Sequence, residues 1–270
     1  MKNRQKWTRI LAIVLAALLV GGTVLSVLVS AFAEESAPGR DAYALEMEYL
    51  EDRQALHISQ RLVFHNDTGD DLDRVVFYAA ANMFRRESAL MYESSALADV
   101  FPSGYAPAGI DLRRVTCDGA AADWGYQGKD EMTLRVACDL KSGASCAFEF
   151  DYYLLLSESR AMIGAYETDV RLSAFYFIPC RYEDGEFYAN SPLQFTRWLD
   201  SGRADYRVTL TLPDAYLPAA TGSETLLGTE DHVSTWTFEA ENVREFTLSF
   251  GRRYRESRAE TASGVTVRVL

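Results

Sequence analysis

Histidine is the residue type on which zinc-dependent hydrolysis would rest, and this chain contains His57, His65 and His232. A zinc peptidase helix carries two histidines four residues apart, with a glutamate after the first to activate water. Here the residues that follow the histidines are isoleucine, asparagine and valine, so no His-Glu pair exists. We therefore predict no catalytic zinc site, no metal ligand and no cofactor.

Paired carboxylates offer a second route to hydrolysis. Glu183, Asp184 and Glu186 surround a glycine in YEDGEFY, residues 182–188. Two carboxyl groups roughly 5 to 10 Å apart in a cleft can cleave a glycosidic bond. The same residue types are typical of a polar hairpin turn. We interpret the segment as a turn and keep a carboxylate-based hydrolase as an alternative.

The acidic segment NDTGDDLD, residues 66–73, contains oxygen ligands of the kind that calcium prefers. It lacks the 12-residue EF-hand pattern and its final glutamate, so we interpret it as a turn between two strands. Asn66-Asp67-Thr68 also fits the glycosylation acceptor pattern, which matters only in a eukaryotic secretory route. The sequence has no G-x-S-x-G elbow and no phosphate-binding glycine motif. We assign no catalytic or cofactor-binding residue.

Short apolar–polar alternations recur along the chain, as in ADYRVTLTLP, and are typical of half-buried strands. No long amphipathic helix is evident; residues 87–109 suggest one or two helical turns followed by a Pro/Gly loop. Many short strands joined by turn residues predict an all-β fold, a β-sandwich of mostly antiparallel strands. The expected strands are 45–49, two within 55–84 around the acidic turn, 110–117, 131–140, 146–156, 169–179, 203–212, 232–240 and 244–254.

Strands 131–140 and 146–156 are expected to form a hairpin, in which Val136 faces Phe148. In the same register Leu134 faces Phe150. The short connection favours direct pairing of the two strands.

That register places Cys138 opposite Cys146, and we predict a disulfide between them in an exported protein. Two buried thiols packed side by side are the alternative. Cys117 has no evident partner, and Cys180 is expected to be a buried free thiol. The chain has no other cysteine and no C-x-x-C pair.

The first 33 residues differ from the rest. Four basic residues precede an uncharged apolar run, residues 10–33, which is long enough to cross a bilayer. The basic flank would keep the start of the chain in the cytoplasm and the remainder outside. Ala31-Phe32-Ala33 fits a signal-peptide cleavage site. Residues 1–33 are therefore either a cleaved signal peptide or a hydrophobic helix that anchors the chain in a membrane.

Residues 34–41 are expected to be a polar linker, residues 42–258 the β-sandwich domain, and residues 259–270 a terminal strand or tail. The protein would be secreted, or membrane-anchored and facing outside the cytoplasm. Residues 34–270 hold 23 basic and 39 acidic residues, a net charge of −16. This charge repels phosphate backbones and disfavours nucleic-acid binding. It weakly suits cationic partners such as peptide amino groups, although a solvated surface also explains it.

Several phrases resemble a known family: HISQRLVFHNDTGDDLDRVVFYAAANMF, FYFIPC, ADYRVTLTLPDAYLPAATG and STWTFEAENVREFTLSFG. In this order and spacing they are similar to the front, N-terminal domain of aminopeptidase N-type zinc metallopeptidases, over nearly all of residues 42–270. The resemblance implies a saddle-shaped β-sandwich. The family's His-Glu-x-x-His and Gly-x-Met-Glu-Asn motifs are absent from this sequence.

The family also has a Gln or Glu that grips the substrate amino terminus shortly before the Pro-Cys element. This chain has Asp169, Val170 and Arg171 at about that place, with Glu167 nearby. Valine cannot hold an ammonium group, so the resemblance carries over no substrate-binding residue.

These observations predict an exported or membrane-anchored, non-catalytic module with a binding or scaffolding role and a protein or peptide partner. Recognition is expected on the loops at residues 87–109 and 157–170. One alternative is a truncated or split zinc aminopeptidase whose catalytic part is lost or lies on another chain. The other is a hydrolase that uses Asp184 and Glu186.

Overall fold

A computed structural model describes residues 39–87, 90, 92, 94–188, 202–264 and 266–269. The predicted hydrophobic helix at residues 10–33 lies outside these residues, as does most of the predicted linker. Across the described ranges, no helix is long and apolar enough to span a bilayer. Strands make up most of the described chain and its helices are few and short, so the all-β prediction is confirmed.

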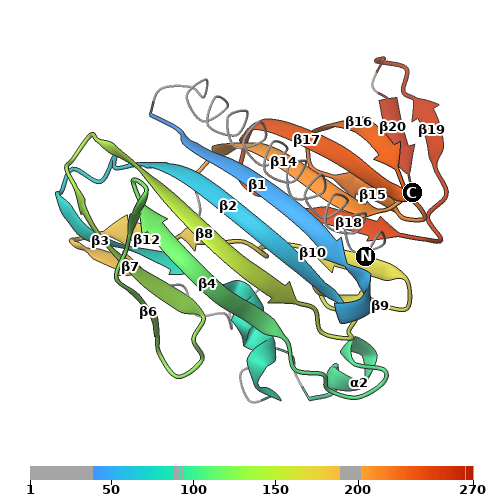
Figure 1. The fold of residues 1–270 in the computed structure, drawn as a ribbon, viewed down its shortest axis with the longest axis horizontal. Coiled ribbons are helices and arrows are strands. Elements are labelled where there is room, and N and C mark those ends of the chain that lie inside the picture. Colours follow the sequence, from blue (N-terminus) through green and yellow to red (C-terminus); the bar gives the residue numbers. More distant parts are fainter. Residues whose placement is uncertain are drawn as a thin grey trace, which may run out of the picture.

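One layer of the fold is an eight-stranded sheet (Figure 1). Its neighbouring strands are antiparallel except for the parallel pair β1 and β14. In spatial order the strands are β16 (Ser223–Glu230), β17 (Val233–Val243), β14 (Ala204–Pro213), β1 (Asp41–Leu50), β2 (Ala55–His65), β8 (Ser145–Leu155), β4 (Gly109–Cys117) and β5 (Ala120–Ala121).

Two four-stranded sheets form the other layer, behind the large sheet in Figure 1. The first has the order β15 (Leu217–Ala220), β18 (Leu248–Gly251), β10 (Asp169–Leu172) and β9 (Ile163–Tyr166). The second has the order β11 (Ile178–Pro179), β3 (Leu72–Tyr78), β7 (Thr133–Leu140) and β6 (Trp124–Gln127). The hairpins are β12 (Arg181–Glu183) with β13 (Glu186–Tyr188), and β19 (Ser257–Glu260) with β20 (Thr266–Val269). Short helices are η1 (Glu51–Arg53), η2 (Ala80–Arg85) and α2 (Leu97–Val100).

The core lies between the two layers. On β2 every second residue is buried, because alternate side chains of a strand point to the same face. The ring of Phe77 on β3 meets that of Phe148 on β8 edge to face, with centroids 5.2 Å apart. Tyr49 on β1 and Phe250 on β18 meet in the same way at 4.9 Å. Both small sheets therefore pack on one face of the large sheet, which confirms the β-sandwich.

A buried glutamine joins the layers where the predicted strand 169–179 is interrupted. Gln60 on β2 donates from Nε2 to the carbonyl oxygen of Phe177 at 2.7 Å, and its Oε1 accepts from the Phe177 N–H at 2.9 Å. The Phe177 ring stacks on Phe150 with centroids 4.6 Å apart. Of the predicted strand 169–179, only the two ends form strands, β10 and β11, whereas residues 173–177 between them do not. The side-chain amide replaces the ladder partner that the backbone at Phe177 would otherwise need.

The predicted hairpin of strands 131–140 and 146–156 is wrong. β7 pairs with β3 and β6 in one layer, whereas β8 pairs with β2 and β4 in the other. Val136 lies opposite Val75, and Phe148 lies opposite Leu62. The register that placed Cys138 opposite Cys146 therefore does not exist. An alternating strand followed by a tight turn is equally compatible with a crossing to the other layer.

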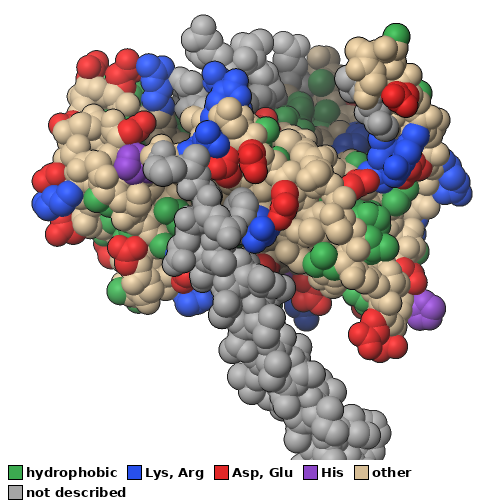
Figure 2. Space-filling model, turned by 90° about the horizontal axis from the view of Figure 1, so that it is seen from above, with side chains coloured by type: hydrophobic (Ala, Val, Ile, Leu, Met, Phe, Trp, Pro, Cys, Tyr) green, Lys and Arg blue, Asp and Glu red, His purple; other side chains and the backbone are tan. Residues whose placement is uncertain are grey.

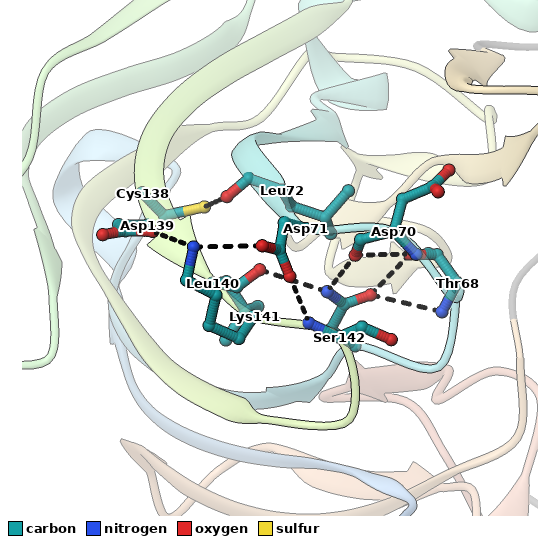
Figure 3. A network of polar contacts seen from close by, with 10 residues as sticks. Thr68, Asp70, Asp71, Leu72, Cys138, Asp139, Leu140, Lys141 and Ser142 are labelled. Atoms are coloured by element: carbon teal, nitrogen blue, oxygen red, sulfur yellow. Dashed lines mark hydrogen bonds and ion pairs between the residues drawn. The ribbon is translucent and has the colours of Figure 1, made fainter.

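The acidic turn after β2 is also a crossing between the layers, since β2 lies in the large sheet and β3 lies in the small sheet that contains β7. Asn66 is fully buried at its start. Its Nδ2 donates to the carbonyl oxygens of Asp70 (2.8 Å) and Leu140 (3.2 Å), and its Oδ1 accepts from the Thr68 hydroxyl at 2.6 Å (Figure 3). The Asn66 backbone N–H donates to Ala144 at 2.9 Å. Asn66 thus ties its own turn to the turn between β7 and β8.

A carboxylate makes a second link between the two turns. Asp71 accepts hydrogen bonds from the Ser142 N–H and from Lys141 Nζ, both at 3.0 Å (Figure 3). The interpretation of residues 66–73 as a turn is confirmed. In the described ranges its carboxylates do not converge with other ligands to within 4.8 Å, as a cation site would require. The Asn66 amide is buried and bonded, so it is not presented for glycosylation.

The strand predicted through residue 84 ends earlier, at Tyr78. Residues Ala80–Arg85 form the helix η2, of which all but the last are buried. Of the one or two helical turns expected within 87–109, one is present as α2 among the described residues.

We predict that Asn66→Ala lowers the free energy of unfolding by about 2 to 4 kcal/mol, because it leaves the buried Leu140 carbonyl and the Thr68 N–H without their partner and removes the bond to Asp70. Denaturant unfolding followed by circular dichroism measures this. Asp139→Ala is the matched control in the same region, since its side chain is 89% exposed. A change in Asn66→Ala no larger than in the control would contradict the role assigned to the amide.

Candidate functional site

The three histidines have three separate environments. His57 stacks on Tyr153 and lies 3.4 Å from Asp151, His65 lies 3.1 Å from Ser145, and His232 is exposed. Among the described residues, no group of three potential metal ligands within 4.8 Å includes a histidine. Within the described ranges, the structure therefore places the three histidines in separate parts of the fold.

The carboxylates of residues 182–188 lie on the exposed hairpin of β12 and β13. Asp184 and Gly185 form its turn, with φ angles of 51° and 83°. Glu183 forms an ion pair with Arg181 at 3.1 Å. The turn interpretation is confirmed. Exposed carboxylates on a hairpin lack the enclosing cleft that acid–base hydrolysis requires, so the geometry does not favour the carboxylate hydrolase.

Residues 167–171 contain no open amine-binding group. Val170 is buried in β10, and Glu167 at the turn before it forms an ion pair with Arg253. Asp169 accepts a hydrogen bond from the Thr168 hydroxyl at 3.4 Å.

The two loops expected to carry recognition meet in space, near α2 and β9 in Figure 1. The Arg160 N–H donates to the carbonyl oxygen of Val100 at 2.8 Å. The Ser103 hydroxyl donates to Glu158 at 2.8 Å. The described parts of segments 87–109 and 157–170 are therefore joined at these contacts, and recognition there stays a prediction.

A pocket of about 470 Å³ opens at the start of β1, at the other end of that strand from η1. Because β1 and β14 run parallel with Tyr43 opposite Tyr206, the two rings stack with centroids 4.8 Å apart. The Tyr176 hydroxyl donates to the Tyr206 hydroxyl at 3.1 Å and accepts from the Phe246 N–H at 3.1 Å. These bonds fix an aromatic wall on one side of the pocket.

Asp41, the first residue of β1, stands at this pocket. Its Oδ1 accepts the His65 N–H at 2.9 Å. The pKa of Asp41 is raised to about 7: burial raises it most, the hydrogen bond from the His65 N–H lowers it, and the negative charge of Asp67 raises it. Part of the residue remains accessible from the pocket. Near neutral pH this carboxyl can therefore exchange a proton or accept a hydrogen bond from an amine.

The rim around Asp41 combines both charge signs. Arg40 donates to Asp205 at 2.7 Å, and Asp205 also accepts the Asn242 N–H at 2.8 Å. Figure 2 shows the same mixture over a whole face of the molecule, where acidic and basic side chains lie in small alternating groups. The pocket thus offers an aromatic wall and carboxyl groups within a mixed field, rather than a pair of groups poised for catalysis.

Sequence reasoning missed Asp41, which it assigned to the end of a linker. The available signal was a carboxylate at the first position of an alternating apolar segment. Its burial depends on β14, which follows more than 150 residues later in the chain.

We predict that the unchanged chain loses stability as the pH rises from 4 to 7, and that Asp41→Asn abolishes this loss. In the unfolded chain this carboxyl ionises near pH 4, whereas in the folded chain it keeps its proton to about pH 7. The folded state therefore binds more protons across this range, and its stability falls as the pH rises. Partial solvent access reduces the effect to the order of 1 to 2 kcal/mol.

Chemical denaturation at pH 4, 5.5, 7 and 8 tests this dependence. The Asn variant should become more stable relative to the unchanged chain as the pH increases. Asp73→Asn is the control, since its side chain is 82% exposed. Parallel pH profiles for the Asp41 variant and the unchanged chain would refute a raised pKa.

Comparisons with known proteins identify the fold. No family model matches the chain, and no curated protein matches its sequence. Among solved structures, an M1 zinc metallopeptidase from Deinococcus radiodurans is similar, with a TM-score of 0.51 and 13% identity. A mutant of the enzyme from that organism has a TM-score of 0.48 and 15% identity, with the same coverage of 85% of this chain and 46% of the enzyme. A two-domain M1 mutant bound to L-tryptophan has a TM-score of 0.48 and 16% identity, covering 85% and 47%.

The first of these likenesses covers 85% of this chain but only 46% of the Deinococcus enzyme. The chain thus spans about half the length of that enzyme. At this identity the likeness concerns the fold alone. The described residues have the β-sandwich fold of part of an M1 zinc metallopeptidase, as expected of a partial, N-terminal domain, and the resemblance inferred from the sequence is confirmed at the level of fold.

Proposed function

We propose that this chain is a non-catalytic β-sandwich module with a binding or scaffolding role, resembling the N-terminal domain of aminopeptidase N-type peptidases. The observation that carries the proposal is the fold match, which covers most of this chain and less than half of the enzyme. In these 270 residues the sequence has no His-Glu pair. Zinc hydrolysis needs both the metal and a base that activates its water.

The pocket at Asp41 is the binding site that we assign to this module. Its lining carries the carboxyl groups of Asp41 and Asp67 and the guanidinium groups of Arg40, Arg181 and Arg203, so it offers partners for both an amino and a carboxylate group. The net charge of −16 on residues 34–270 favours approach of a cationic segment. A peptide segment that carries groups of both charge signs therefore fits the site best.

Export is part of the proposal. Residues 10–33 would hold the module at a membrane or be removed as part of a signal peptide, with the sandwich outside the cytoplasm in either case. The partner would then be an extracellular or cell-surface protein or peptide rather than a nucleic acid.

A split zinc aminopeptidase is the second candidate, and the coverage supports it. More than half of the Deinococcus enzyme has no counterpart in this chain. A catalytic region on another polypeptide could supply the zinc motif, with this chain as its scaffold. The proposal and this alternative differ in whether activity returns when the partner is present.

We predict that the purified 270-residue chain releases no amino-terminal residue from fluorogenic amino acid amides and contains zinc far below one equivalent. Its melting temperature should be the same with and without a chelator, because apolar packing rather than a metal holds the core. Measurements are amide hydrolysis, metal analysis and thermal unfolding. The variant His57→Ala with His65→Ala controls for a contaminating peptidase, whose trace activity it would not change.

Affinity purification from the native organism separates the two candidates. The non-catalytic module predicts no peptidase activity in the recovered complex. Recovery of a chain with His-Glu-x-x-His, together with activity that requires both chains, would replace the proposal with the split enzyme.

A further inference from the structure

Two cysteines that the sequence did not pair with each other lie on neighbouring strands of the large sheet. Cys117 ends β4, and Cys146 is the second residue of β8. Cys117 lies opposite Phe148, so Cys146 is its diagonal neighbour two residues along β8. The two sulfur atoms lie within 4.8 Å of each other.

The backbone beside this pair is held by a tight turn. Asp118 and Gly119 have φ angles of 50° and 77°, and Cys117 pairs with Ala120 across the turn. The Asp118 N–H donates to the Ala147 carbonyl at 2.8 Å, and the Asp118 carboxylate accepts the Ala147 N–H at 2.9 Å. The ends of β4 and β8 are therefore fixed next to each other, with both thiols on the core-facing side.

We propose that Cys117 and Cys146 form an intramolecular disulfide when the chain meets a disulfide oxidant such as glutathione disulfide. This pairing takes the place of the bond between Cys138 and Cys146. Cys138 lies on β7 in the opposite layer, where its thiol donates to the carbonyl oxygen of Leu72 at 3.7 Å (Figure 3). Cys138 does not belong to the group of side chains in which the sulfur atoms of Cys117 and Cys146 lie within 4.8 Å of each other.

The reaction is a thiol–disulfide exchange in two steps. Cys117 is the more accessible thiol, whereas Cys146 is 3% exposed. The Cys117 thiolate attacks one sulfur of glutathione disulfide, forms a mixed disulfide and releases one glutathione thiolate. The Cys146 thiolate then attacks Sγ of Cys117 and displaces the second. The protons of the two protein thiols pass to the two glutathione thiolates, so two thiols are oxidised and one disulfide is reduced.

Burial raises the pKa of both thiols, which keeps them protonated at neutral pH. Only the thiolate attacks a disulfide, so bond formation should accelerate as the pH rises from 7 to 9.

Peptide mapping of the full chain tests the pairing directly. Trypsin cuts after Arg114, Lys129, Arg135, Lys141 and Arg160, which places the three cysteines on separate peptides: 115–129, 136–141 and 142–160. The protein is equilibrated with glutathione disulfide, alkylated, digested without reduction and analysed by mass spectrometry. We expect peptide 115–129 linked to peptide 142–160. A link between 136–141 and 142–160, or alkylation of all three cysteines, would overturn the proposal.

Variants keep the test independent of any one substitution. Cys138→Ser should retain the linked peptides, and Cys117→Ser should lose them while leaving Cys146 alkylated. Cys180→Ser is the matched control, a buried cysteine elsewhere in the fold. Because the bond would enclose 28 residues, oxidation should raise the melting temperature by about 5 °C or more. An equal rise in Cys117→Ser would show that oxidation acts elsewhere.

Discussion

The sandwich depends on how the chain crosses between its layers. A crossing removes the backbone from both sheets, so its N–H and C=O groups must find other partners. Asn66 and Asp71 solve this at one end by bonding the turn after β2 to the turn after β7 (Figure 3). Gln60 meets the same need inside the core at Phe177, where the chain passes from one small sheet to the other within one layer. The two buried side chains, those of Asn66 and Gln60, end in neutral carboxamides. A carboxamide forms several hydrogen bonds without the cost of burying a charge.

These crossings decide which side chains become neighbours. β7 lies in a small sheet of the other layer, and the neighbour of β8 in the large sheet is β4. Cys117 on β4, rather than Cys138 on β7, therefore approaches Cys146. At the other side of β2, the parallel pairing of β1 with β14 brings Tyr43 beside Tyr206 and forms the wall of the Asp41 pocket. The pocket and the cysteine pair are thus both products of strand order.

The amino-acid sequence predicts the strands with one buried face well. β2 and β14 alternate regularly because one side of each faces the core, and their bounds differ from the prediction by at most a few residues. β16 had no such signal, since nearly all its residues are exposed at a sheet edge. The hairpin of β7 and β8 failed because alternation does not tell which strand lies alongside. Asp41 escaped notice for a related reason: its burial comes from segments distant in sequence.

The place of β1 in the large sheet has a mechanical consequence. β1 is bonded to β2 on one side and to β14 on the other, so the first strand of the described residues is an interior strand rather than an edge. Sheet hydrogen bonds run across the strands. In a chain tethered through residues 10–33, a pull along β1 would load both ladders in shear, and many bonds would have to break together. A tethered edge strand would instead peel away one bond at a time, so this topology suits a module that stays folded under tension.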